Sequence, residues 1–436
     1  MKNAVSGVGL APDAAMVTFP INMFLPGADI AALNERRREI YEGLTGWKSQ
    51  FAQAAGPAKM LEVEGATYEE ALTKANNLLL ANSWGDGLPL WPATRERVDW
   101  ILRGATEPRT HVLGKFPPRG GITTVETCAV ALAMAGGRPE YLPVLVAAVE
   151  ACFAADGFDQ LQATSGGPFP AVIVNGPIAK QIRINSGFGL LEPDPQRPAG
   201  ASIGRALRLL QQNVGGALPG VGTMAIFGAM RYTNAVFAED EESLPPGWEP
   251  HATQRHGFAP GTNSVSVVFA SGAANVRRRG AKKETAEEDV LNGMWRMADF
   301  MRGPNLSVLH GWDKGTPGVM MIAPIVAKRM AEIGWTQRSV REFLWENSKI
   351  PMEKMRRYGG TAWIEIDADP AVRESLKLDP WPICSRPENI VLVVAGGSHP
   401  THTYWLQAHS PTVTGRVIRV PETYDGLLAN ADRDLG

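Results

Sequence analysis

Two histidines lie three residues apart in a short polar segment, 396–402, that directly follows an apolar run. Imidazole titrates near neutral pH, so His399 and His402 could move protons, contact a substrate or bind a metal. Pro400 prevents the two rings from sharing a helix face, which favours acid–base or substrate roles over metal ligation. Ser398 adds a hydroxyl beside them. An ordinary surface loop is the alternative interpretation.

A second polar loop follows the apolar run 171–174, which is typical of a buried strand. In α/β sheets, ligands bind beyond the carboxyl ends of strands. Asn175 and Asn185 could orient a polar substrate there or stabilise an oxyanion, although Asn-Gly and Asn-Ser-Gly also favour local Asx turns. We expect both asparagines and the 396–402 segment to line one shared pocket.

A third group of candidates belongs to two predicted helices. Thr123 and Glu126 have capping-box spacing at the start of an Ala-rich helix. Glu126 could therefore serve as a general acid or base, or only as part of the cap. Cys128, beyond the first turn of that helix, is expected to be a buried and unreactive thiol. Arg205, near the start of a later helix, could hold a carboxylate or phosphate through its two-pronged guanidinium, or form an internal salt bridge.

Two other patterns are interpreted structurally. Residues 200–204 match GxSxG, but no strand precedes them, so Ser202 is predicted to be a helix N-cap rather than a nucleophile. The acidic run 239–242 is predicted to be a surface turn, with cation binding as the less favoured alternative.

The elements that must position these residues alternate between strands and helices. Apolar runs predict strands at 171–174, 264–270, 318–322 and 389–395, with an edge strand at 413–420. Helices are predicted between them. We therefore expect an α/β or α+β fold, a layered sheet with flanking helices. Residues 1–65 would form a helical N-terminal appendage for docking and 66–436 the main region, with a division into two lobes near 240–285 left open.

Composition excludes several classes of protein. The 436 residues carry 43 basic and 45 acidic side chains, so net charge gives no reason to expect nucleic-acid or membrane binding. Three cysteines without a CxxC pair suit a reducing compartment, and no apolar run reaches the length of a membrane span. We expect a cytoplasmic globular protein.

Five strings within residues 80–420 carry a resemblance to a known family; they are 85–89, 138–144, 172–179, 184–187 and 203–209. Together they resemble a family of uncharacterised bacterial proteins that is associated with proteins carrying a UGSC selenocysteine/cysteine motif. The resemblance implies thiol or selenol redox chemistry. This sequence contains no UGSC or CGSC string, and the family positions that it keeps are polar: Glu126, Asn175, Asn185 and Arg205.

These observations predict an enzyme of the lyase or hydrolase type that uses general acid–base catalysis and oxyanion-type stabilisation. Its substrate would be a small polar or anionic metabolite, held without an organic cofactor or resident metal. The predicted catalytic residues are Glu126, His399 and His402, and the predicted substrate-binding residues are Asn175, Asn185, Arg205 and Ser398. A partner-dependent subunit of a thiol or selenol redox complex is the alternative, and a metal-dependent hydrolase a third. A homo-oligomer or a small redox partner protein is left open.

Overall fold

The computed structural model describes residues 29, 31–46, 60–228, 233–277, 285–303, 312–357, 361, 364–365, 369–400, 402–410 and 412–436. The chain divides into two compact units, residues 1–74 and 75–436. In the first unit, α2 (Ala31–Glu35) and α3 (Arg37–Thr45) are described, and α3 carries surface ion pairs such as Arg38–Glu42. The helix α4 (Tyr68–Ala81) spans the division between the units.

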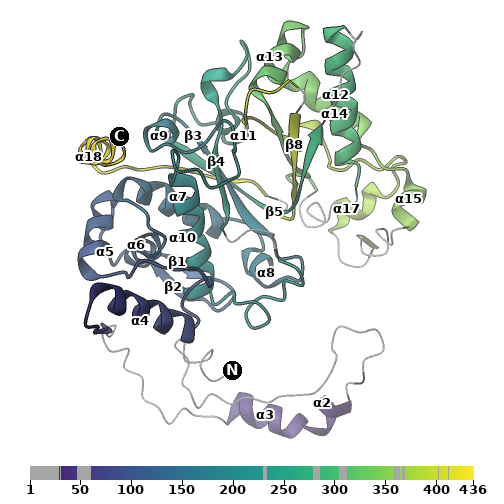
Figure 1. Cartoon of the computed structure of the whole chain (residues 1–436). Helices are drawn as coiled ribbons and strands as arrows, with labels where there is room; N and C mark the ends of the chain where they lie inside the picture. Colours follow the sequence, from purple (N-terminus) through teal and green to yellow (C-terminus); the bar gives the residue numbers. More distant parts are fainter. Residues whose placement is uncertain are drawn as a thin grey trace. The chain divides into compact units, whose positions relative to one another are not determined.

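The second unit is built on a curled, mixed sheet with flanking helices, so the predicted α/β layered fold is confirmed (Figure 1). Within the described part of the chain the sheet has seven strands, in the order β4-β3-β5-β8-β6-β7, with β9 also paired to β5. Their bounds are β3 (Phe169–Asn175), β4 (Ala235–Ala238), β5 (Ser264–Arg277), β6 (Gly318–Ile322), β7 (Val391–Val394), β8 (His402–Ala408) and β9 (Thr414–Val417). A separate hairpin comprises β1 (Val112–Phe116) and β2 (Gly121–Thr124).

The sheet consists of two halves with the same pairing. In the first half β3 is parallel to β4 and antiparallel to β5. In the second half β6 is parallel to β7 and antiparallel to β8. Because β5 and β8 pair antiparallel with each other, the halves are related by an approximate twofold rotation. The two outer strands meet where the sheet curls: the Asp240 amide, just after β4, donates to the Val394 carbonyl at 2.8 Å.

The sequence after the first strand of each half is also related. Residues 177–180 read Pro-Ile-Ala-Lys and 324–328 read Pro-Ile-Val-Ala-Lys. The first begins the short helix α9 (Ile178–Gln181) and the second begins α13 (Pro324–Glu332). Proline suits the first turn of a helix because it has no amide hydrogen to leave unpaired.

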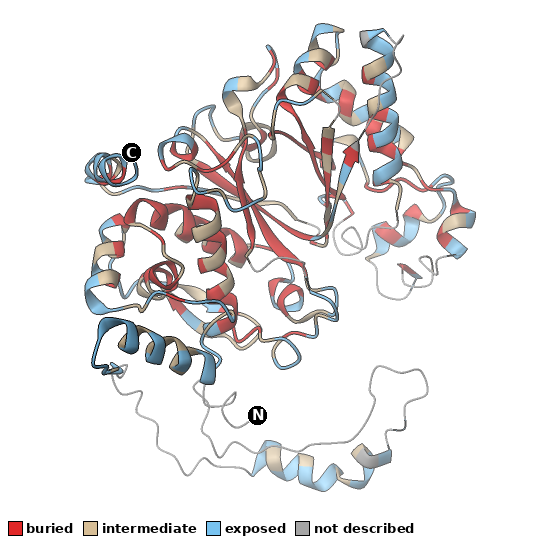
Figure 2. Ribbon diagram, in the orientation of Figure 1, coloured by how far each residue is buried: buried red, intermediate tan, exposed pale blue. Residues whose placement is uncertain are grey.

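In the described part of the chain three apolar cores hold the sheet, and Figure 2 shows the strands in the red of buried residues. One lies inside the curl and takes the side chains of alternate residues such as Ile173, Phe237 and Met321. The others lie on the outer faces, one under the helices of each half. This is why the strands are apolar on both faces instead of alternating with polar residues.

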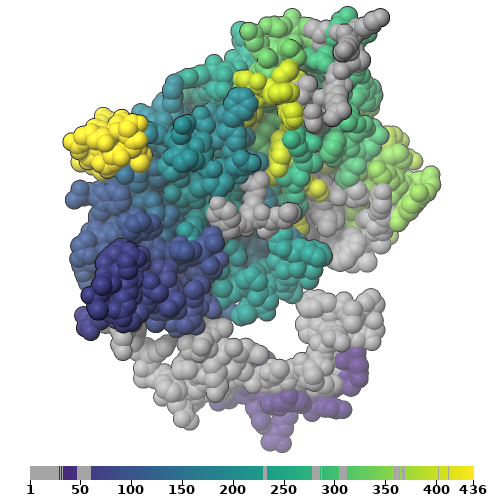
Figure 3. Space-filling model, viewed as in Figure 1, coloured from purple at the N-terminus to yellow at the C-terminus, as the bar shows by residue number. Residues whose placement is uncertain are grey.

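Helices cover both outer faces. Over the first half lie α5 (Arg95–Ile101), α6 (Val125–Met134), η2 (Pro139–Tyr141), α7 (Leu142–Phe153), α8 (Phe158–Ala163), α10 (Ala199–Asn213) and α18 (Tyr424–Leu435). Figure 3 shows α18, in yellow, on the surface beside the blue segments. The second half has α12 (Ala286–Met301), α14 (Gln337–Asn347), α15 (Met352–Arg357) and α17 (Pro370–Ser375). The short helix α11 (His251–His256) follows β4 and precedes β5.

Two predicted helix caps are wrong in detail. The cap of α6 is Thr124, which exchanges hydrogen bonds with Thr127, while Thr123 is buried in β2. The hairpin continues one residue further than the capping-box spacing indicated, so Glu126 is not part of the cap. Ser202 lies inside α10, which begins at Ala199, because Pro198 already occupies the cap position. No helix in the described residues is both long and apolar enough to cross a membrane.

Candidate active site

The carboxyl ends of β3 and β4 hold a buried glutamate that the sequence reasoning assigned to a surface turn. Glu239 follows β4 and is only 5% exposed. One of its oxygens, Oε2, accepts hydrogen bonds from the Asn175 side-chain amide and the His251 backbone amide, both at 2.7 Å. Its Oε1 accepts from the Val394 amide at 3.4 Å. The carboxyl group is therefore held by residues from both halves of the sheet.

A second carboxylate lies next to it. The Asn175 side-chain nitrogen also donates to Glu241 Oε1 at 2.8 Å, and the Gly176 amide donates to that same oxygen at 2.7 Å. Asn175 thus bridges two carboxyl groups with its two amide hydrogens. Glu241 is half-buried, whereas Glu239 lies beneath it.

Burial changes the acidity of Glu239. Its pKa is raised to about 7, because desolvation by burial and, to a smaller extent, the neighbouring Glu241 raise it more than the three N–H donors lower it. The helix α11 carries two imidazoles, and its first residue, His251, donates its backbone amide to Glu239. Burial lowers the pKa of His251 and brings that of His256 to about 4, so both rings are neutral at pH 7.

In the described part of the chain, some buried polar atoms of nearby residues have no hydrogen-bond partner. Among the described residues, buried atoms of this kind include Asn175 Oδ1, Ser264 Oγ and His251 Nε2. Asn175 and Ser264 are directly paired across β3 and β5, so their side chains lie on the same face of the sheet. These atoms can accept or donate to a bound polar group.

Glu239 and Glu241 line a cleft of about 1060 Å³, which we call the first cleft. Its wall carries three cations: Lys180, Arg183 and Arg197. Each of them pairs with an acidic residue: Lys180 with Glu242 at 2.8 Å, Arg183 with Asp432 at 3.3 Å and Arg197 with Asp194 at 3.0 Å. The first cleft therefore presents charges of both signs, as a site for a polar molecule does.

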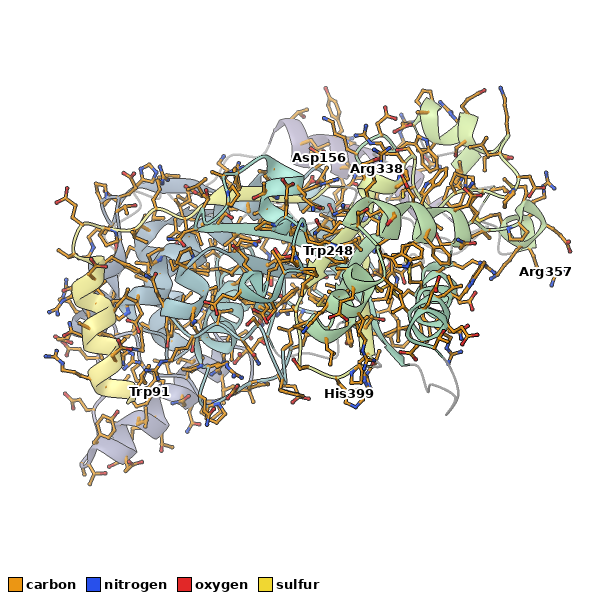
Figure 4. The ribbon with its side chains drawn as sticks, turned by 90° about the horizontal axis from the view of Figure 1, so that it is seen from above. Trp91, Asp156, Trp248, Arg338, Arg357 and His399 are labelled. Carbon is orange, nitrogen blue, oxygen red and sulfur yellow. The ribbon has the colours of Figure 1, made fainter. Side chains whose placement is uncertain are left out.

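A second cleft of about 540 Å³ lies at the ends of β6 and β7. His399 and His402 line it, together with Phe188 and the backbone of Gly396 and Gly397. His399 is exposed at the periphery of the molecule (Figure 4). Ser398 is exposed in the same loop.

The prediction that both asparagines and the 396–402 segment line one shared pocket is therefore wrong. The segment 184–187 runs between the clefts: the Asn185 carbonyl accepts from the Ala238 amide, and the Ser186 carbonyl accepts from the Gly396 amide at 2.7 Å. Ser186 lines the first cleft and Gly187 the second. The two strand-end loops do come together, but a strip of backbone divides the space between them.

Both asparagines have internal partners. Asn175 directs its amide hydrogens to the two glutamates, and Asn185 forms an Asx turn, accepting from the Gly187 amide and donating to the Phe188 carbonyl, both at 2.8 Å. Neither side chain directs an N–H into a cleft. Their effect is to shape the site: Asn175 positions carboxyl groups, and Asn185 holds the dividing strip.

Two other predicted residues lie outside both clefts. Arg205 binds Asp86 through two parallel hydrogen bonds, of 2.7 and 2.9 Å, and also donates to the Pro89 carbonyl at 2.9 Å. Arg205 therefore forms an internal salt bridge, which was the alternative to the predicted role in binding a carboxylate or phosphate. Glu126 is half-exposed and pairs with Arg109, which also contacts Asp99.

The thiols offer no nucleophile. Cys128, Cys152 and Cys384 are free and buried, and burial raises the pKa of each. Cys128 thus lies where the sequence predicted.

None of the protein families, curated proteins or solved structures with which the chain was compared matches it. The two clefts themselves therefore indicate what the protein can bind.

Proposed function

We propose that this protein is an enzyme that transfers protons on a small polar or anionic substrate bound in the first cleft, with Glu239 as the general acid and base. The observation that carries the proposal is a buried carboxyl group with a pKa of about 7 that lines a cleft. A group whose pKa lies near the working pH can both donate and accept a proton efficiently. Strongly shifted carboxyl groups also gather at active sites.

The second carboxylate supports a two-group mechanism. Glu241 is bridged to Glu239 by the Asn175 amide. In an elimination, one carboxylate removes a C–H proton while the protonated carboxyl group delivers a proton to the departing oxygen. In a hydrolysis, the same pair activates water and protonates the leaving group. The pair therefore favours a lyase or a hydrolase, and the free thiols are consistent with a reducing compartment such as the cytoplasm.

Arg183 supports a substrate that carries negative charge. It lines the first cleft and has a φ of 60°, a left-handed conformation that non-glycine residues rarely adopt. The Ile184 amide bonds back to the Ala179 carbonyl, so Arg183 occupies the position after α9 where glycine is usual. Its side chain is one-third exposed, and its pairing with Asp432 at 3.3 Å is at the surface. A strained arginine at a cleft fits a role for its guanidinium in binding an anion.

Two measurements test the proposal. The pKa of Glu239, followed by carboxyl carbon NMR, should be near 7, and a value near 4.5 would overturn it. A panel of small hydroxy acids, esters and amides should contain a substrate whose turnover by Glu239→Gln falls at least ~100-fold and loses its pH dependence near neutrality.

The matched control is Glu150→Gln. Glu150 is a glutamate with a side chain 22% exposed that pairs with Arg419 and lies outside the first cleft. It should keep full activity. Equal activity of the Glu239 and Glu150 variants would contradict the role of Glu239.

A further inference from the structure

The two histidines of the second cleft lie unusually close to each other. His402 Nδ1 is 3.0 Å from His399 Nδ1, and the rings are nearly perpendicular, with centroids 4.7 Å apart. His402 is the first residue of β8 and His399 belongs to the loop after β7. Pro400 is in a turn, and neither histidine belongs to a helix. The proline that argued against a metal in a helical arrangement therefore does not prevent one here.

The separation of the two nitrogens matches that of two ligands on one metal ion. With metal–nitrogen distances of about 2.0–2.1 Å and angles between 90° and tetrahedral, two bound nitrogens lie about 2.9–3.4 Å apart. Two neutral imidazoles at this distance need one Nδ1–H to form a hydrogen bond, whereas a metal ion uses both lone pairs. Neutral imidazole is a preferred ligand of zinc, copper and nickel.

The surroundings leave room for exchangeable ligands. Asn275, Glu192 and Tyr404 also line the second cleft. Within the described parts of the chain, no three or more histidine, cysteine or acidic side chains gather closely enough to enclose an ion. A metal held by the two imidazoles would therefore keep positions for water or for a bound molecule, as catalytic rather than structural sites do.

We propose that His399 and His402 form a binding site for a divalent transition-metal ion of the zinc class in the second cleft. The two Nδ1 atoms are the protein ligands, and the remaining positions face the open cleft. The site does not depend on Glu239, which lies in the first cleft. A chain that does not bind zinc would therefore contradict the metal site only, and a Glu239 variant with full activity would contradict the proposed function only.

The test is calorimetric titration of the full chain, prepared without a histidine tag, with zinc chloride and separately with magnesium chloride. We expect zinc to bind at one equivalent and magnesium to give no binding heat, because imidazole is a poor ligand for magnesium. His399→Gln and His402→Gln should each weaken zinc binding at least ~10-fold. His111→Gln changes an exposed histidine outside the second cleft and should bind zinc like the natural chain.

A spectroscopic measurement accompanies the titration. On addition of zinc to the natural chain, the Nδ1 nitrogen resonances of both histidines should shift. Because the rings are at the surface, both variants should keep the circular dichroism spectrum of the natural chain. The proposal would be overturned if zinc did not bind, or if either substitution left zinc binding unchanged. The 3.0 Å contact between the rings would then be a hydrogen bond only.

Discussion

In the first half of the sheet, Asn175 is the last residue of β3 and Glu239 follows β4, whereas Ala323 and Ala395 follow β6 and β7 in the second half. The strand pairing makes these positions equivalent: the Glu239 amide donates to the Val174 carbonyl, and the Ala395 amide donates to Ile322 in the same way. One backbone arrangement thus carries an amide and a carboxyl group in one half and two methyl groups in the other.

The third strand shows the converse. Ser264 pairs with Asn175 across the first half, and the corresponding residue of β8 in the second half is His402. The polar chemistry of the second half therefore lies on β8 and its preceding loop instead of on the parallel strands. The two halves therefore share backbone positions for a functional group. The residue type at each position decides whether a carboxyl group, an imidazole or only a methyl group lies there.

The first prediction concerns a variant that gives the first half an alanine where the second half has Ala323. Asn175→Ala removes the amide that binds both carboxylates, and hydrogen bonds to charged groups are worth about 1.5–3 kcal/mol each. We expect a loss of about 4 kcal/mol in the free energy of unfolding at pH 8, and a smaller loss at pH 5, where Glu239 is protonated. Urea denaturation at the two pH values measures both losses.

The double variant Asn175→Ala/Glu239→Ala reproduces the pair found in the second half. Replacing both partners leaves no buried charge without its donor. It should therefore be at least ~1 kcal/mol more stable at pH 8 than the single Asn175 variant. A double variant that is less stable than the sum of the single losses would break the comparison.

The second prediction concerns the pH dependence that Glu239 gives to the first half. Its pKa is raised from 4.5 to about 7 in the folded chain. The stability associated with the protonated group is fully present below pH 4.5 and is lost as the pH rises through 7, an effect of about 3 kcal/mol. Glu239→Gln should abolish this decrease. Unfolding free energies measured from pH 4.5 to 8.5 that still fall as in the natural chain would contradict the assignment.

The third prediction concerns Arg205 in α10, which we expect to contribute to stability and not to substrate binding. Arg205 and Asp86 have side chains 16% and 4% exposed and share two hydrogen bonds. Lysine keeps the charge but loses the paired geometry, so Arg205→Lys should cost about 1–2 kcal/mol. Substrate affinity per folded molecule should not change. Thermal melts measure the loss of stability, and ligand titration measures the affinity. A ~10-fold weaker affinity would show that Arg205 contributes to substrate binding.

The fourth prediction concerns the second residue after the helix that follows the first strand of each half. Gly334 follows α13 with a φ of 91°, and Arg183 follows α9 with a φ of 60°. Arg183→Gly should remove backbone strain and raise stability by up to ~1 kcal/mol. It should also weaken binding of an anionic substrate. Gln181→Gly, a change in the same cleft without strain to relieve, is the control and should lower stability.

The smallest effect is expected at the thiols. Cys128 lies in the core under the first half and Cys384 in that under the second, and both are fully buried. Iodoacetamide under native conditions should leave activity and mass unchanged. Rapid modification of Cys128, detected by mass spectrometry, would contradict its burial.

Local pattern was sufficient for much of the fold. The run 318–322 is a strand with those bounds, and the predicted run 171–174 lies within β3. Such features depend on neighbours within a few residues, which the sequence displays. The strands β4 and β8 were not predicted, because β4 has only four residues and β8 begins with polar residues.

What the sequence alone determined was the layered sheet, its apolar strands and the polar loops at their ends. Only the tertiary structure decided what those loops do. Glu239 belongs to an acidic run that is typical of a surface turn, and it is buried because the sheet curls until β4 meets β7. His399 and His402 meet because His399 lies in the loop after β7 and His402 begins β8. The pKa of a carboxyl group and the distance between two rings depend on residues far away in the chain, and these become neighbours only on folding.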